Sequence, residues 1–172
     1  MEKNKIYEEI KCTNFRELVS SCSTRFGNRT AFTIKDKYKN LHDISFIDFE
    51  NNIKELGSSL LDLGLENKKV AIISQDRYEW CCSYLAIATA GCIVVPLDFM
   101  LPEVEQLRLI IESQVDAIIF DEKRLNLAKD VITSKDSNVK YFICMDYNED
   151  ENGINLHFWY DKQSKSCNAF TI

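Results

Sequence analysis

The stretch that decides the fold runs from residue 70 to residue 100 and reads "VAIISQDRYEWCCSYLAIATAGCIVVPLDFM". Its first four residues are a short apolar run that favours a strand, and residues 77–90 follow with a pattern typical of a helix. Four strand-forming residues come next, at 92–95, and Pro96 ends them. A strand, a helix and a second strand in this order are typical of a βαβ unit, whose two strands run parallel.

The same alternation continues along the chain. A helix is predicted near 102–112, a strand at 117–120, a shorter helix near 122–132 and a fourth strand at 140–145. The strand segments are apolar without alternation, which is typical of strands covered on both faces. The sequence therefore predicts an α/β fold: an open, mostly parallel sheet with helices on both faces.

The segment before this core predicts a helix and a hairpin. The helix spans 14–26, with Thr13 as its cap and Gly27 at its end. Two short strands, 30–34 and 41–46, flank a polar turn.

A second helix follows the hairpin. Ser45 and Asp48 have the spacing of a capping box at its start, and Gly64 is expected to close it. Its apolar residues recur at helical spacing, which predicts one core-facing stripe. They are Phe49, Ile53, Leu56, Leu60 and Leu63.

Composition excludes several classes of function. The chain has 172 residues, of which 45% are hydrophobic, and a net charge of −6. We expect no nucleic-acid partner from this charge, and no transmembrane segment or signal peptide, because no apolar run is long enough. The seven cysteines form no C-x-x-C pattern, so we interpret them as small hydrophobes, Cys82 and Cys92 among them, in a reducing compartment. A cytoplasmic protein is the expectation.

The loop after the first buried strand, "SQDRYEW" (74–80), contains no glycine. A dinucleotide-binding fold needs G-x-G-x-x-G here, so that the backbone can approach a pyrophosphate. Asp76 and Glu79 instead fit a helix cap and a first helical turn. Neither G-x-x-x-x-G-K-[ST] nor G-x-S-x-G occurs anywhere in the chain. We expect no nucleotide at this loop.

Other candidate site residues favour structural roles. The stretch "NEDENG" (148–153) matches the first positions of a calcium loop, but Trp159 stands where the bidentate Glu belongs, so a solvated turn is the better interpretation. His42 and His157 lack a Cys or Ser partner at an informative spacing, and His42 is expected at the surface. Trp80 is expected to pack in the core.

The order of these segments resembles the N-terminal part of the AMP-forming acyl-CoA synthetases, the adenylate-forming ligases. The resemblance lies in "FRELVSSCSTRFGNRTAF" (15–32), "ISFIDFENNIKELGSSLLDLGLENKKVAIIS" (44–74), "YEWCCSYLAIATAGCIVVPLD" (78–98) and "LPEVEQLRLIIESQVDAIIFDEK" (101–123). It covers roughly residues 13–145 and is greatest for the bacterial long-chain fatty acid–CoA ligases. We therefore expect residues 1–12 to be an N-terminal extension, 13–145 the first α/β subdomain of that fold, and 146–172 a poorly defined tail with at most one strand.

The resemblance implies a parent enzyme that joins a fatty acid to CoA with ATP and Mg²⁺. The family's Ser/Thr/Gly-rich loop ending in P-K-G is absent from this sequence, as are the later motifs and the domain with the catalytic lysine. Adenylation is attack of a carboxylate on the α-phosphorus of ATP, and it needs amides, a magnesium ion and cations held in place. We expect an N-terminal fragment that binds no cofactor and is inactive without the remainder of the synthetase, its expected partner.

The resemblance also suggests four site residues. Asp98 and Phe99 are expected to edge the CoA path, and Lys123 and Arg124 to meet the CoA phosphates. No catalytic and no metal-binding residue is expected. The alternative is that Pro96 and Pro102 only mark the ends of the junction and that Lys123 and Arg124 are solvated.

Two other classes of protein stay open. One is a stand-alone α/β module that binds a partner or a small ligand without catalysis. The other is a flavodoxin-like redox domain, against which the missing phosphate-binding loop counts.

Overall fold

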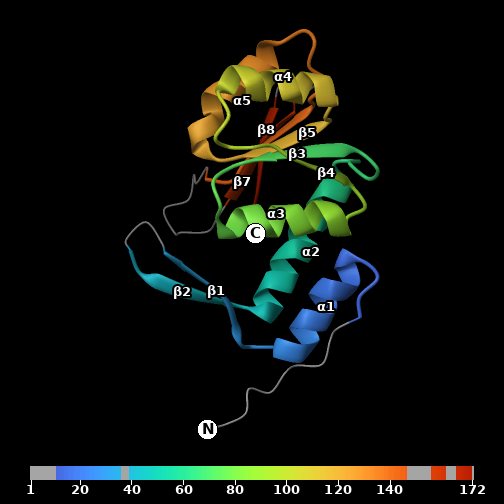
Figure 1. The fold of residues 1–172 in the computed structure, drawn as a ribbon, viewed down its shortest axis with the longest axis vertical. Helices are drawn as coiled ribbons and strands as arrows, with labels where there is room; N and C mark the ends of the chain where they lie inside the picture. Colours follow the sequence, from blue (N-terminus) through green and yellow to red (C-terminus); the bar gives the residue numbers. More distant parts are fainter. Residues whose placement is uncertain (1–10, 36–38, 147–155, 162–165, 172) are drawn as a thin grey trace. The chain divides into compact units, whose positions relative to one another are not determined.

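The computed structural model describes residues 11–35, 39–146, 156–161 and 166–171, the last two ranges as backbone strands only (Figure 1). The chain divides into two compact units, Met1–Glu50 and Asn51–Ile172, and each is described by itself. The expected boundaries at residues 12 and 145 differ from this division and stay a prediction.

The first unit begins with helix α1 (Phe15–Phe26). Asn14, and not the predicted Thr13, caps the helix: its Oδ1 accepts a hydrogen bond from the backbone N–H of Glu17 at 2.8 Å. The prediction for Thr13 is wrong because the first helical residue is Phe15, which places Asn14 at the capping position. Thr13 instead donates from its backbone N–H and its hydroxyl to the Glu17 carboxylate, both at 2.9 Å. Gly27 ends the helix with a φ of 54°, as predicted.

Strands β1 (Thr30–Lys35) and β2 (Leu41–Ser45) form the predicted antiparallel hairpin. The Thr33 hydroxyl donates to Asp43 Oδ1 across the two strands at 2.6 Å. His42 is exposed, as expected. The hairpin is therefore held by local polar contacts more than by burial.

Helix α2 (Phe46–Asp62) starts with the predicted capping box. The Asp48 N–H donates to Ser45 Oγ at 3.1 Å, and the Ser45 N–H donates to Asp48 Oδ2 at 3.3 Å. The predicted apolar stripe is confirmed over Ile53, Leu56 and Leu60, which are at most 2% exposed.

The described strands of the second unit form a six-stranded sheet of order β4-β3-β5-β6-β7-β8. The strands are β3 (Lys69–Ile73), β4 (Ile93–Pro96), β5 (Ala117–Phe120), β6 (Tyr141–Cys144), β7 (Leu156–Asp161) and β8 (Ser166–Thr171). The four strands from β4 to β6 run parallel, as predicted. Strands β7 and β8 continue the sheet antiparallel, so the expected tail holds two strands and not one.

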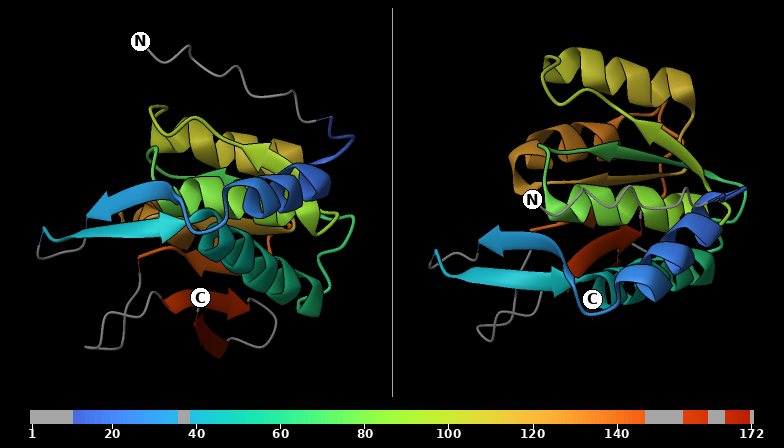
Figure 2. Two further views of the ribbon diagram at one scale, coloured as in Figure 1. Left: turned by 90° about the horizontal axis from the view of Figure 1, so that it is seen from below. Right: turned by 60° about the horizontal axis from the view of Figure 1, so that its bottom comes forward.

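Helices cover both faces of the parallel strands (Figures 1 and 2). They are α3 (Tyr78–Thr89), α4 (Glu103–Ser113), the short 3₁₀ helix η1 (Glu122–Arg124) and α5 (Leu125–Thr133). Residues of α4 and α5 such as Ile110 and Leu127 pack on the face that carries Ile118, whereas Ile87 of α3 packs on the face that carries Ile119. Successive strand residues therefore enter opposite cores, which explains why the strands are apolar throughout.

Two helix starts differ from the predictions. Arg77 is the N-cap of α3 and makes no side-chain capping bond, so the prediction of Asp76 as the cap is wrong, whereas Glu79 lies in the first turn as expected. The segment predicted as one helix, 122–132, begins with the 3₁₀ turn η1 before α5. In both places the residue before the helix makes a long-range contact: Arg77 pairs with Asp146, and Asp121 accepts from the Gln75 N–H.

The buried cysteines agree with their interpretation as small hydrophobic residues. Cys82, Cys92 and Cys144 are buried, and the six cysteines that the structure describes are free thiols.

Trp80 is partly buried against the core on the α3 side and stacks on Tyr84, with ring centroids 5.4 Å apart. Among the described helices, none has the length and apolar character that a membrane crossing requires. The stretch 148–153 and the His157 side chain lie outside the described residues.

Candidate functional site

The carboxyl ends of β3, β5 and β6 open into a hollow of about 290 Å³. The helix after β3 packs on one face of the sheet, and the helices after β5 pack on the other. Ligands of open α/β sheets bind at the carboxyl ends of two neighbouring strands whose following helices lie on opposite faces of the sheet. The hollow is lined by Gln75, Asp76, Arg77, Asp121, Glu122, Lys123 and Asp146.

Arg77 joins two sides of this hollow. Its Nε donates to Glu79 Oε2 at 2.6 Å, and its Nη1 forms a short ion pair with Asp146 Oδ1. Asp146 Oδ2 also accepts from the backbone N–H of Glu122 at 2.9 Å. Burial disfavours the Arg77 cation, but the hydrogen bonds to both carboxylates outweigh it and raise the pKa of Arg77. The guanidinium therefore links the start of α3 to the end of β6, and its charge is already neutralised.

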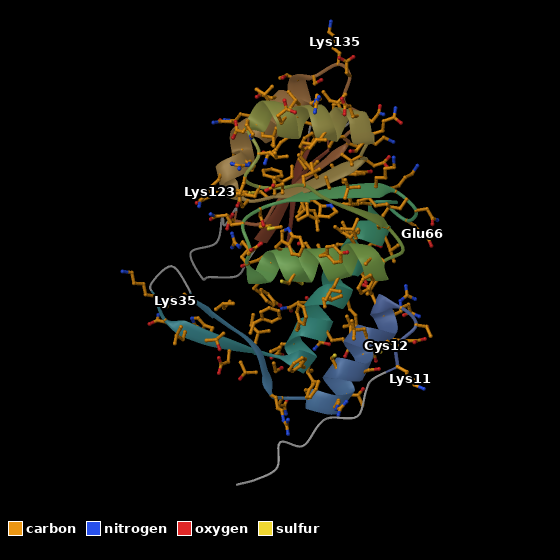
Figure 3. The ribbon with its side chains drawn as sticks, in the orientation of Figure 1. Lys11, Cys12, Lys35, Glu66, Lys123 and Lys135 are labelled. Carbon is orange, nitrogen blue, oxygen red and sulfur yellow. The ribbon has the colours of Figure 1, made fainter. Side chains whose placement is uncertain are left out.

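Asp121 and Gln75 link the ends of β5 and β3. Asp121 is 3% exposed, and its Oδ2 accepts from the backbone N–H of Gln75 at 3.3 Å. The Gln75 side chain in turn accepts a hydrogen bond from Lys123 Nζ at 2.6 Å. Lys123 is exposed, and Figure 3 shows it at the opposite end of the parallel strands from Glu66, which precedes β3.

The lining of the hollow holds more carboxylates than cations. Four carboxylates and two cations line it, and one of the cations is paired with Asp146. No glycine is among the lining residues, so no backbone loop is free to wrap around phosphate oxygens. Among the described residues, no three His, Cys, Asp or Glu side chains gather as a group that could hold a metal ion.

The loop after β4 forms a second feature of this edge. Asp98 Oδ1 accepts from the backbone N–H of Met100 at 2.8 Å, and the Asp98 carbonyl accepts from that of Leu101 at 3.4 Å. Gln106, fully buried on α4, donates from Nε2 to the carbonyl of Asp98 at 2.8 Å and to that of Phe99 at 3.3 Å. The tight turn is therefore tied to the helix that follows it.

Arg124 grips the same loop from η1. Its Nη2 donates to the Phe99 carbonyl at 2.5 Å, and its guanidinium carbon lies 3.9 Å from the centroid of the Phe99 ring. The side chain is 14% exposed and also faces Glu103 at 3.9 Å. A stacked guanidinium with carbonyl and carboxylate partners is bound inside the protein.

Two buried polar atoms of this cluster lack a hydrogen-bond partner within the described chain. They are Gln106 Oε1 and Arg124 Nε. Leaving such an atom unpaired costs about 1–3 kcal/mol.

The structure brings three of the four sequence-predicted site residues together and leaves one apart. Asp98, Phe99 and Arg124 form one cluster at the loop after β4, whereas Lys123 lies at the hollow. Whether any of them meets CoA stays a prediction. Gln106, Arg77 and Asp146 were not among the residues predicted from the sequence. The signal for Gln106 was a polar residue in the apolar spacing of α4, four residues before Ile110.

The chain belongs to the AMP-binding enzyme family, whose model matches residues 20–168. This match covers the hairpin, the loops of the hollow and the sheet up to the middle of β8. The class that the fold and the family define is the adenylate-forming ligase, and the chain has the fold of the N-terminal part of such enzymes.

Individual relatives agree with this assignment. Over 116 residues the chain is 28% identical to the polyketide synthase-nonribosomal peptide synthetase phmA of Phaeosphaeria nodorum, which covers 67% of this chain and 3% of that protein. It is also 28% identical to 4-hydroxybutyrate–CoA ligase 2 of Metallosphaera sedula over 102 residues, which are 59% of this chain and 18% of that protein.

A solved structure shows the same fold. The anthranilate CoA ligase AuaEII, in complex with anthranoyl-AMP, superposes with a TM-score of 0.69 at 20% identity, over 81% of this chain and 26% of that one. The chain spans less than a fifth of the length of both curated relatives named above. Their whole-protein activities therefore concern regions beyond the matched part.

Proposed function

We propose that this chain supplies the first α/β part of an ATP-dependent acyl-CoA synthetase and is catalytically incomplete by itself. The observation that carries the proposal is a family match over residues 20–168 in a sequence without a Ser/Thr/Gly-rich P-K-G loop. The partner of this chain is then the remainder of the synthetase.

A fatty acid is the proposed acyl substrate, and the cytoplasm, where ATP and CoA are available, is the proposed location. The fatty acid rests on the sequence resemblance to long-chain ligases. The free described cysteines support a reducing compartment.

The test compares two lengths of the same protein. Pyrophosphate release is measured with ATP, Mg²⁺ and fatty acids of several lengths, first for the 172-residue chain and then for this chain extended by what its reading frame encodes downstream. We expect no turnover from the first and turnover from the second. Turnover by the 172-residue chain refutes the proposal. A stop codon directly after Ile172, with a stably folded product, favours the stand-alone binding module.

For the CoA path we propose that Asp98 and Phe99 form its rim and that Lys123 approaches a CoA phosphate. Lys123 is exposed, whereas the Arg124 guanidinium is engaged by Phe99 and Glu103. In the extended enzyme, Lys123→Glu is expected to raise the KM for CoA about tenfold with little change in the KM for ATP, as loss of a charged contact predicts. Lys135→Glu, an exposed lysine elsewhere on the same unit, is the control (Figure 3). Equal KM values for CoA in both variants contradict this role.

A further inference from the structure

We propose that Gln106 is a positioning residue that, together with Arg124, holds the loop after β4 in one conformation. The inference deepens the proposed function, because that loop is the proposed rim of the CoA path. It assigns Arg124 the task of placing Phe99, and it adds a residue that the family resemblance did not indicate.

The Gln106 amide can point in only one direction. Both contacts of Nε2 are with backbone carbonyls, those of Asp98 and Phe99, at 2.8 and 3.3 Å. Carbonyl oxygens only accept hydrogen bonds, so only the –NH₂ end of the amide can face them. The orientation of the side chain is therefore fixed by chemistry, and no acceptor-only side chain can replace it.

Two separate elements converge on one carbonyl. The Phe99 oxygen accepts from Gln106 of α4 and from Arg124 of η1, whose Nη2 lies at 2.5 Å. The Arg124 guanidinium also covers one face of the Phe99 ring at 3.9 Å. The Phe99 carbonyl is thus held by two elements and the ring by one of them, so the ring cannot turn away without losing its contact with the Arg124 guanidinium.

Two polar atoms of the cluster are buried without a partner in the described chain. Gln106 Oε1 accepts nothing and Arg124 Nε donates to nothing among the described residues, although both are buried. A leucine at position 106 has the size and polarity of the neighbouring core residues and leaves no orphan atom. The hydrogen bonds from Gln106 Nε2 to the loop carbonyls explain why a glutamine stands at this buried position although its Oε1 has no partner.

Arg124 and Lys123 differ in exposure. Arg124 is turned inward and is 14% exposed at its side chain, whereas the neighbouring Lys123 is exposed at the hollow. The two adjacent cations therefore differ in role: Arg124 positions Phe99 of the loop after β4, and Lys123 faces solvent. The planar fork of arginine suits the first task, because it can stack on a ring and donate to a carbonyl at once.

The experiment measures backbone amide exchange of the 172-residue chain by NMR. The reporters are the amides of Met100 and Leu101, which donate to the side chain and to the carbonyl of Asp98. Gln106→Met keeps the length of the side chain and removes its donors. We expect the exchange of both reporters to rise about tenfold or more, with little change at the β3 amides, because only the local opening becomes easier.

Arg124→Lys keeps the charge but loses the stacked plane, and we expect a smaller rise of about threefold at the same amides. Two controls lie on α4: Ile110→Val loosens the core beneath the helix, and Arg108→Lys changes an exposed arginine paired with Glu105. Both are expected to leave the reporters unchanged.

Reporters that exchange at the wild-type rate in folded Gln106→Met, or equally fast in Ile110→Val, overturn the proposal. If Gln106→Met does not fold, an unchanged rate in Arg124→Lys overturns it. The measurement needs neither ligand nor turnover, so its outcome is separate from the pyrophosphate assay. Reporter rates as expected, together with an extended chain that never uses CoA, refute the proposed function alone.

Discussion

The β1–β2 hairpin and the parallel strands β3–β6 are both β-structure, yet they are stabilised in different ways. Every residue of β5 is buried, as are four of the five in β3, whereas β1 and β2 have no buried residue. The hairpin instead carries side-chain hydrogen bonds from Thr30 and Thr33 to Asp43. Non-local burial stabilises the sheet, and local polar contacts with ring contacts such as Phe32–Phe49 stabilise the hairpin.

The hairpin and the sheet therefore differ in how much stability a substitution removes. In a sheet covered on both faces, truncation of a buried side chain loses packing. A hairpin with exposed strands loses only the contact that is removed.

The largest effect is expected at Ile72 of β3, which is 0% exposed. Ile72→Ala removes three buried carbon atoms and is expected to lower the free energy of unfolding by about 2–5 kcal/mol. Ile93→Ala in β4 is the matched control, because Ile93 is 50% exposed and should cost less than about 1 kcal/mol. Urea unfolding followed by circular dichroism gives both values. Similar losses would show that the two strands do not differ as described.

The next effect depends on pH and concerns Cys82 of α3. Burial raises the pKa of its thiol to about 12, from an ordinary value of 9.0. Below pH 9 the thiol is protonated in both the folded and the unfolded chain; above it the unfolded chain ionises first, so stability falls as the pH rises from about 9 towards 12.

Cys82→Ala serves as the reference, because it lacks the titrating group. The difference in unfolding free energy between wild type and Cys82→Ala should shift against the wild type from pH 8 to pH 10.5. Urea unfolding at several pH values measures it. A difference that stays constant over this range contradicts a raised pKa.

A smaller effect is expected at the start of α1. Asn14→Ala removes the side chain that caps the helix and should destabilise it by about 1 kcal/mol. Thr13→Ala removes only an exposed contact with Glu17 and should cost less. Exchange of the Leu18 amide, which donates to the Asn14 carbonyl at 3.1 Å, reports on this end of the helix. A greater loss in Thr13→Ala would restore the cap predicted from sequence.

The smallest effect is expected at Asp43 of the hairpin. Asp43→Ala removes the acceptor for the hydroxyls of Thr30 and Thr33 and should cost about 0.2–1 kcal/mol. Asp62→Ala, an exposed aspartate at the end of α2, is the control. NMR shift changes should stay within β1 and β2. Changes that reach the amides of β3 would show that the hairpin and the sheet depend on one another.

The fold was predictable because its signals are periodic and repeated. Continuous apolar strands separated by amphipathic segments indicate a parallel sheet covered on both faces, and this is confirmed. The capping box at Ser45 was also predictable, since both partners lie within one turn. The antiparallel strands β7 and β8 were not, because a short hairpin at a sheet edge lacks a pattern that distinguishes it from an irregular tail.

The candidate site was predictable only in part. The resemblance pointed to Asp98 and Phe99, which lie on the loop after β4, and to Lys123 and Arg124, which lie in η1 after β5. The partners of Arg124 and Arg77 could not be read from sequence. Arg77 pairs with Asp146 across 69 positions, and Arg124 reaches Phe99 across 25. No periodic signal links residues so far apart.

From the sequence alone followed the class of fold, the order of its strands and helices along the chain, and the lack of a phosphate-binding P-K-G loop. These depend on local composition and spacing, and burial then enforces them. Only the tertiary structure decided that Arg124 turns inward onto Phe99 while Lys123 stays in solvent, and that Gln106 holds the loop after β4. Such choices arise when strands far apart in sequence become neighbours, because only then do their loops share carbonyls, rings and carboxylates.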